Sequence, residues 1–161
     1  MTQKSSPESE LRIVPYEQRH AGAFRDLNLE WIREYFTLEE LDRQHLFSPA
    51  EAILSPGGAI FIAERGAVVV GCCALLNHGG GVYEVSKMAV DRSCRGHGVG
   101  RVLLAEVMRR AQAMGATKLT IVSNTVLGPA IHLYKQLGFR EVPLRSQAYA
   151  RGNIALEFTF A

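Results

Sequence analysis

The sequence predicts a single α/β domain of the α+β type, with seven strands and four helices in irregular alternation. Two observations support this prediction. First, 161 residues with 47% hydrophobic content suffice for one substantial core and not for two. Second, the segment 82–104 starts with strand-forming residues, continues with a glycine-rich run and ends with apolar residues at helical spacing. We expect a flexible polar segment at 1–10 and one domain over 11–161.

Turn and capping residues divide the rest of the chain. Arg65-Gly66 marks a hairpin, Gly115 suits a helix C-cap, and Pro129 suits the first turn of a helix. The run Thr37-Leu38-Glu39-Glu40 is typical of a capping box, so a second helix is expected to begin there. The expected strands are 11–16, 59–64, 68–76, 82–90, 118–123, 140–142 and 154–160, and the expected helices are 17–35, 37 onward, 99–114 and 129–137.

Composition argues against several classes of function. A net charge of +2 gives no reason to expect a nucleic acid or a membrane as partner. No apolar run reaches membrane-spanning length, and the first ten residues lack the apolar centre of a signal peptide. The three cysteines have no metal-ligand spacing, and the adjacent Cys72 and Cys73 are expected to be buried on opposite faces of a strand. These features favour a reducing cytoplasm and no metal site.

The glycine-rich run from Arg95 to Arg101 has the properties of a phosphate-binding turn. Glycine has no Cβ, so the backbone can approach a ligand closely and adopt positive φ. The first amides of the following helix have no internal partner, and the helix dipole adds positive charge there. A phosphate or pyrophosphate fits such a place, and the two arginines flank it.

Known nucleotide fingerprints fail at this turn. The dinucleotide pattern, counted from Gly96, requires a third glycine where Arg101 stands, and the acidic residue expected about 20 positions later is missing. No Gly-Lys pair occurs, which rules out a P-loop. A nucleotide-binding domain of another fold is therefore disfavoured. The remaining pattern is R-x-x-G-x-G, formed by Arg95, Gly98 and Gly100.

This pattern, together with the preceding strand residues 84–90, resembles motif A of the GNAT superfamily of acyl-CoA-dependent N-acetyltransferases. A second stretch from Asn124 to Phe139, with Ala-x-x-Leu-Tyr and Leu-Gly-Phe, looks like the family's motif B. The order of predicted elements is also the family's order. The resemblance covers about residues 58–139, while the first helices and the tail match only in element type. It implies a central mixed, mostly antiparallel sheet that is splayed at its middle.

The resemblance also implies how acetyl-CoA binds. The cofactor enters the wedge between the central strand and the strand after the motif helix, where its pantetheine amides pair with strand backbone. The pyrophosphate lies on the amides of the glycine turn, and no metal takes part. The residues expected to bind acetyl-CoA are Met88, Ala89, Val90, Arg95, Gly96, His97, Gly98, Val99, Gly100, Arg101 and Asn124.

Acetyl transfer requires a general base, because an alkyl amine is mostly protonated at pH 7 and must be neutral to attack a thioester. Glu84 is the candidate base, since it lies on the central strand near the expected opening and some branches of the family carry a glutamate there. The alternative is a solvent-facing carboxylate paired with Lys87 or Arg92. His78 in the glycine-rich loop is a weaker candidate base. The other histidines with structural context are expected to be exposed: His45, His97 and His132.

Tyr134 is the candidate general acid for the leaving thiolate. The family's motif places a tyrosine at this point, and a phenol can donate a proton at pH 7. The alternative is a packing residue beside Ile131 and Leu137, with its hydroxyl satisfied elsewhere.

The acceptor site is the least specified part. The resemblance places it among the first two helices and the last two strands, where Trp31, Arg33, Tyr35, Tyr149 and Arg151 occur. Aromatic rings with two arginines suit a small primary amine that bears a carboxylate, such as an amino acid or a peptide end. These residues can equally be surface and packing residues. The function expected is N-acetylation by acetyl-CoA, the alternative is a non-catalytic acyl-CoA sensor, and a homodimer stays open.

Overall fold

The computed structural model describes residues 10–145 and 148–161. Seven strands form one mixed sheet in the order β1-β2-β3-β4-β5-β7-β6, as the fold prediction requires. The strands are β1 (Leu11–Pro15), β2 (Ala59–Arg65), β3 (Val68–Asn77), β4 (Val82–Val90), β5 (Lys118–Ser123), β6 (Arg140–Val142) and β7 (Ile154–Thr159). The helices are α1 (Ala21–Tyr35), α2 (Glu40–Phe47), α3 (Val99–Ala113) and α4 (Gly128–Gln136), with short turns η2 (Gln18–His20), η3 (Ala50–Leu54) and η4 (Arg92–Cys94).

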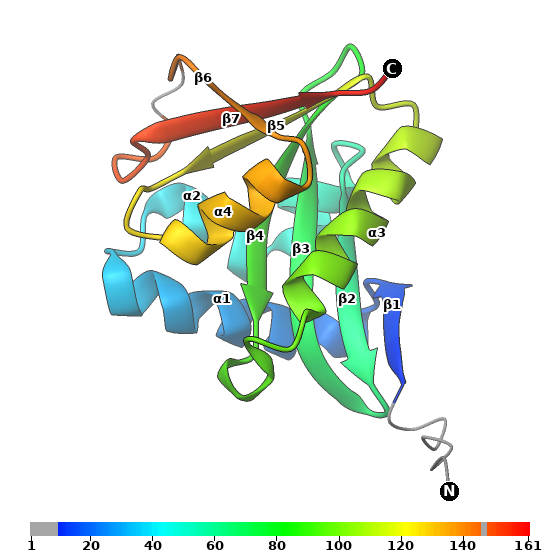
Figure 1. Ribbon diagram of the computed structural model, residues 1–161. Coiled ribbons are helices and arrows are strands. Elements are labelled where there is room, and N and C mark those ends of the chain that lie inside the picture. The colour runs from blue at the N-terminus through cyan, green and yellow to red at the C-terminus, as the bar shows by residue number, and fades with distance from the viewer. Residues whose placement is uncertain (1–9, 146–147) are drawn as a thin grey trace, which may run out of the picture.

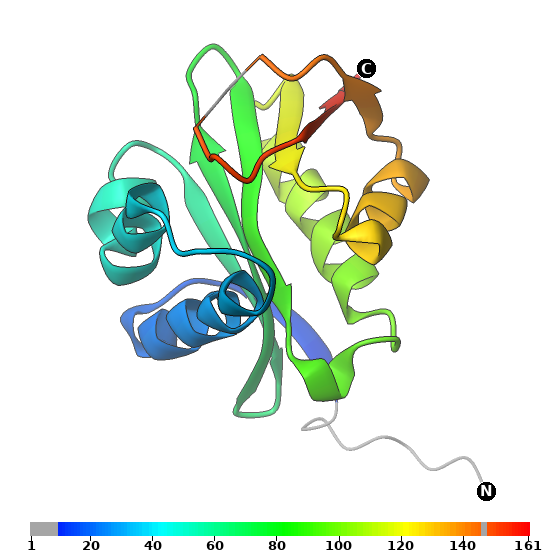
Figure 2. The same ribbon diagram turned by 90° about the vertical axis from the view of Figure 1, so that its left-hand side faces the viewer.

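The sheet lies between two layers of helices. Figure 2 shows α1 and α2 on one face and α3 and α4 on the other. Each layer encloses its own apolar cluster: one lies between the sheet and α3 and α4, and the other, smaller cluster lies between the sheet and α1, α2 and η3. Cys73 belongs to the first cluster and Cys72 to the second, which confirms their predicted opposite orientation.

The sheet opens at its middle. All neighbouring strands pair antiparallel except β4 and β5, which run parallel. This parallel pairing is limited to residues 82–84 with residues 118–120, and Figure 1 shows β5 and β7 turning away from β4. The splay implied by the family resemblance is therefore confirmed.

A β-bulge in β4 accompanies the opening. Tyr83 and Val85 contribute to the cluster under α3, whereas Ala89 belongs to the cluster under α1. The pairing register with β3 shifts at this point, and Lys87 has a φ of 52°. An extra residue in one strand reverses the alternation of faces beyond it. As a result, Lys87 points toward the α2 side of the sheet, where it meets Asp42.

The start of α2 differs from the prediction. The N-cap is Glu39, not Thr37, and the capping box pairs Glu39 with Asp42. The backbone amide of Glu39 donates to the Asp42 carboxylate at 2.9 Å. The box at Glu39 forms instead of the one predicted at Thr37 because Arg151 and Lys87 also bind the Asp42 carboxylate. Within the described part of the chain, no helix is long and apolar enough to cross a membrane.

Candidate active site

The opening between β4 and β5 contains a first cavity of about 400 Å³. Residues 85–90 of β4 and 121–123 of β5 line it, together with the start of α3 and part of α4. Beyond Glu84, β4 pairs only with β3, and beyond Thr120, β5 pairs only with β7. Both strands thus present an open backbone edge to the cavity. Such an edge can pair with the amides of an extended ligand.

The glycine turn closes one end of this cavity. Gly98 is the N-cap of α3 with a φ of 80°, and Gly96 has a φ of 78°. A Cβ at either position would meet no atom within 4 Å, so the space beside the turn is open. Left-handed backbone, open space and the free amides of a helix N-terminus suit a pyrophosphate. The residues present therefore fit acetyl-CoA.

Most of the predicted cofactor residues come together here. The lining includes Met88, Ala89, Val90, Arg95, Gly96, Gly98, Val99, Gly100 and Asn124. His97 and Arg101 are exposed and do not line the cavity, and Arg101 donates to Gln136 of α4 at 3.2 Å. The side-chain amide of Asn124 donates to the backbone oxygen of Arg151 at 2.7 Å. Asn124 thus braces the loop that leads into β7.

Tyr134 lines the first cavity from α4 and is 8% exposed. Its ring packs 6.1 Å from the ring of Phe139, but its hydroxyl makes no hydrogen bond to any described residue. Burial raises the pKa of Tyr134, so the phenol keeps its proton throughout the neutral range. Within the described chain no fully buried side-chain oxygen lacks a partner, so this hydroxyl is accessible from the cavity and available to a ligand there.

A second cavity of about 680 Å³ lies beside the paired part of β4 and β5 and extends to the point where the two strands separate. It shares Ile121, Val122 and Tyr149 with the first cavity, so the two meet there.

Glu84 faces this second cavity. It pairs with Thr120 in the last rung before the strands separate, and its side chain is 13% exposed. Its carboxylate lies 2.8 Å from Nε2 of His78, and this hydrogen bond raises the pKa of the imidazole. Neither partner considered from the sequence is its ion-pair partner, since Lys87 pairs with Asp42 and Arg92 with Glu30 and Glu34.

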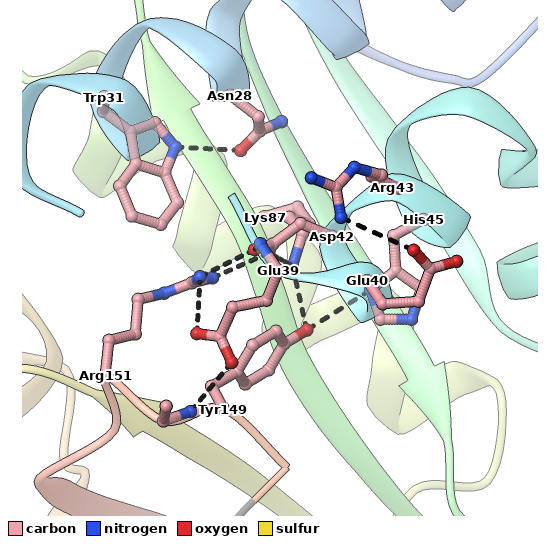
Figure 3. A network of polar contacts seen from close by, with 11 residues as sticks. Asn28, Trp31, Glu39, Glu40, Asp42, Arg43, His45, Lys87, Tyr149 and Arg151 are labelled. Carbon is pink, nitrogen blue, oxygen red and sulfur yellow. Dashed lines mark hydrogen bonds and ion pairs between the residues drawn. The ribbon is translucent and has the colours of Figure 1, made fainter. Parts of the chain in front are cut away.

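A buried ionic cluster contributes side chains to both cavities: Lys87, Tyr149 and Arg151 line the first, and His45 and Tyr149 line the second. Figure 3 shows its polar contacts. Asp42 receives both terminal nitrogens of Arg151 at 2.7 Å and lies 3.0 Å from Nζ of Lys87. Lys87 also donates to the Tyr149 hydroxyl at 2.9 Å, and that hydroxyl lies 3.3 Å from Nδ1 of His45. We call Asp42, His45, Lys87, Tyr149 and Arg151 the junction cluster.

Burial and charge set the protonation of this cluster. Burial alone would raise the pKa of Asp42, but hydrogen bonds from Arg151 and the charge of Lys87 hold that pKa well below its usual range. Burial lowers the pKa of Lys87, an effect that the adjacent Asp42 opposes. Burial and then the charge of Lys87 lower the pKa of His45 to about 4. His45 is therefore neutral at pH 7, and it is 5% exposed, so its predicted place on a helix surface is wrong.

The comparisons with known proteins agree with this geometry. The sequence model of the Acetyltransferase (GNAT) family matches residues 23–139. The chain belongs to this family. It is an acetyl-CoA-dependent acetyltransferase.

Relatives of this GNAT chain include an IAA acetyltransferase of Azospirillum brasilense, 31% identical over 65% of this chain and 74% of the relative. An uncharacterized N-acetyltransferase of Schizosaccharomyces pombe is 27% identical over 73% of this chain and 74% of that one. Among solved structures, a GNAT acetyltransferase of Staphylococcus aureus has a TM-score of 0.81, with 18% identity over 93% of this chain and 99% of that one. A putative acetyltransferase of Salmonella typhimurium, solved with acetyl-CoA, has a TM-score of 0.75, with 19% identity over 94% of both chains.

The acceptor residues expected in this GNAT chain are divided by the structure. Trp31, Tyr35, Tyr149 and Arg151 line the first cavity, and only Tyr149 also lines the second. Arg33 is exposed and lines neither. The guanidinium of Arg151 lies 4.5 Å from the centre of the Tyr149 ring and 5.8 Å from that of Trp31.

Sequence reasoning missed three members of the junction cluster: Asp42, His45 and Lys87. One signal was present. In the series Tyr83, Val85, Met88 and Val90, the residues recur two positions apart except for the step of three from Val85 to Met88. Such a step indicates a bulge, and a bulge would have turned Lys87 away from its expected face.

Proposed function

We propose that this acetyltransferase moves the acetyl group of acetyl-CoA to a primary amine, with Glu84 as general base and Tyr134 as general acid. One observation carries the proposal: two cavities meet where β4 and β5 separate, with the free hydroxyl of Tyr134 on one side and the Glu84 carboxylate on the other. Acetyl-CoA occupies the first cavity, along the open edge of β4 and the turn at Gly98. The amine occupies the second cavity.

The base step belongs to Glu84. It accepts a proton from the ammonium form of the acceptor, directly or through one water, and so frees the nitrogen lone pair. The new bond joins this nitrogen to the thioester carbonyl carbon, and the carbon–sulfur bond breaks. His78, 2.8 Å from the carboxylate and half exposed, connects Glu84 with solvent and provides a route for the proton to leave.

The acid step belongs to Tyr134. It donates its hydroxyl proton to the departing sulfur, which would otherwise leave as a thiolate. The phenolate then regains a proton from the nitrogen, directly or through water, as that nitrogen becomes the neutral amide. Because burial raises the pKa of this phenol, the donor form persists across the neutral range. The non-catalytic acyl-CoA sensor is not favoured by any of these observations. The cytoplasmic location and the homodimer considered from the sequence stay predictions.

The experiment that tests the proposal pairs two conservative variants in a free-thiol release assay. Tyr134→Phe should lower turnover about 10²-fold, because it removes only the proton donor. Its acetyl-CoA affinity and melting temperature should stay near the parent's, since the hydroxyl makes no hydrogen bond in the described chain. A Phe variant with full turnover across the pH range, or one that loses stability and keeps turnover, would contradict the acid role.

Glu84→Gln should likewise lower the rate about 10²-fold at neutral pH and leave acetyl-CoA affinity unchanged, because the side chain faces only the second cavity. The matched control is His78→Gln, which removes the partner of Glu84 and leaves the carboxylate in place. If Glu84→Gln matches the parent in turnover and pH profile while His78→Gln does not, the base is His78.

A further inference from the structure

The second cavity is mostly apolar in its depth. Leu156 and Ile121 form its floor and are 0% and 2% exposed, and Leu76 at 9% adds to the wall. Aliphatic walls of this kind hold the apolar part of a ligand, and a few polar groups fix its orientation. The acceptor's body should therefore be apolar.

At the junction with the first cavity, the acidic side chain in the described lining of the second cavity is Glu84. His78 also lines this end, but its Nε2 is already engaged by the Glu84 carboxylate at 2.8 Å. His45 and Tyr149 are neutral at pH 7, since burial lowers the pKa of His45 to about 4 and raises that of Tyr149. This end of the cavity attracts an ammonium group and repels a carboxylate.

The two cations nearest to this junction are already engaged. Arg151 makes two 2.7 Å bonds to Asp42 and one of 3.3 Å to Glu39, and Lys87 lies 3.0 Å from Asp42 with its side chain 2% exposed (Figure 3). Withdrawing either cation toward a substrate would leave Asp42, which is 0% exposed, short of a partner. Breaking a buried ion pair costs about 3–5 kcal/mol. Neither cation is therefore free to bind a carboxylate of the acceptor.

The remaining cations of this cavity lie too far out. Lys118 pairs with Glu157 at 3.5 Å and stands two residues before Thr120, about 7 Å along β5 from the rung of Glu84. Arg145 is exposed at the rim. In an α-amino acid, the carboxylate carbon lies only about 2.5 Å from the nitrogen. A carboxylate so placed would meet Glu84 and neither of these cations.

We propose that the acceptor is a primary amine on an apolar body, with no carboxylate on the carbon that carries the amine. The inference rests on the proposed function, and it differs from the carboxylate-bearing amine expected from the sequence. Two arginines were expected to bind that carboxylate. Arg33 lines neither cavity, and Arg151 is held by Asp42 and Glu39.

The test measures kcat/KM by thiol release for three amines of matched size: 2-phenylethylamine, phenylalaninamide and phenylalanine. The first two should exceed phenylalanine about tenfold or more, because only phenylalanine places a carboxylate beside Glu84. Phenylalaninamide carries a neutral carboxamide of similar size in place of the carboxylate, so it separates the effect of the negative charge from the effect of the group's size. Phenylalanine turned over as well as or better than its amide would overturn the inference and leave acetyl transfer to amines standing.

The control variant is Arg145→Ala, which removes the arginine at the rim. The variant should leave kcat/KM for 2-phenylethylamine unchanged. A loss of phenylalanine turnover in Arg145→Ala, together with a parent preference for phenylalanine, would show that the rim arginine reads an α-carboxylate and would refute the proposal. Failure of the proposed function gives a different result, in which acetyl-CoA binds by calorimetry and no amine releases thiol.

Discussion

Asp42 is the residue on which the electrostatics of the site depends. Its carboxylate receives the amide of Glu39, the guanidinium of Arg151 and the ammonium of Lys87, and so joins α2, β4 and the segment before β7. Because every acceptor position is used, Asp42 is ionised while fully buried. The cluster thus places Lys87 and Arg151 next to the junction of the cavities, but both are paired with Asp42 and so are not available to a substrate.

His45 makes this cluster sensitive to acid. Burial lowers its pKa to about 4 from an ordinary 6.5, so between these values the unfolded chain binds a proton and the folded one does not. Its contribution to stability is complete above about pH 6.5 and decreases as the pH falls toward 4. His45→Asn keeps an acceptor for the Tyr149 hydroxyl and removes the titration. The melting temperature of the parent should therefore fall more steeply from pH 7 to 5 than that of this variant.

The matched control for this prediction is His132→Asn, which changes an exposed histidine of α4. Its melting curve should follow the parent's at each pH. Parallel slopes for the parent and His45→Asn would show that His45 does not titrate in the window that burial sets.

At the scale of elements, the turn at Gly98 couples β4 to α3. Gly98→Ala should raise the Kd for acetyl-CoA about tenfold, about 1.4 kcal/mol, because its methyl group occupies the open space beside the helix N-terminus. Gly115→Ala is the matched control: its φ is 94°, its Cβ would also meet nothing within 4 Å, and it follows the far end of α3. Both variants should lose about 1–2 kcal/mol of stability from left-handed strain.

Only the variant at the turn should lose affinity in calorimetry. Equal affinities for the two folded variants would mean that the pyrophosphate does not lie on these amides.

Much of the order of elements could be predicted from the sequence, because local signals determine it. The bounds of β4, β5 and β6 agree with the predicted 82–90, 118–123 and 140–142, since glycines and turn residues delimit these strands. The site was predictable where it is local, as at the glycine turn. The junction cluster was not, because Lys87 meets Asp42 and Tyr149 through contacts 45 and 62 positions apart along the chain. Nor did the run 42–55 indicate the π-helical turn η3.

For the whole molecule, the sheet acts as a partition between two apolar clusters of different size. The ion pairs that join α2 to β4 and to the segment before β7 lie on the same side of the sheet as the smaller cluster. The helices α3 and α4 carry the larger cluster and, as proposed, the walls that acetyl-CoA contacts. The two layers therefore need not have equal stability.

The reaction rates of the two adjacent cysteines can measure how often each side of the sheet opens. Cys72 and Cys73 are both 0% exposed, and burial raises the pKa of each thiol, so neither reacts until its own side of the sheet opens. In a Cys94→Ser background, Cys73→Ala leaves a thiol on the α1 side and Cys72→Ala leaves one on the α3 side. With an aromatic disulfide reagent, the thiol at position 72 should react faster, because the smaller cluster covers it.

Equal labelling rates for the two thiols, both matching global unfolding in urea, would contradict this expectation and show that the layers open only together. Unequal rates would mean that one dipeptide reports separately on two halves of the molecule. Acetyl-CoA should then slow labelling of the thiol on the α3 side more than labelling on the α1 side. The two thiols would thus show on which side of the sheet ligand binding suppresses local opening.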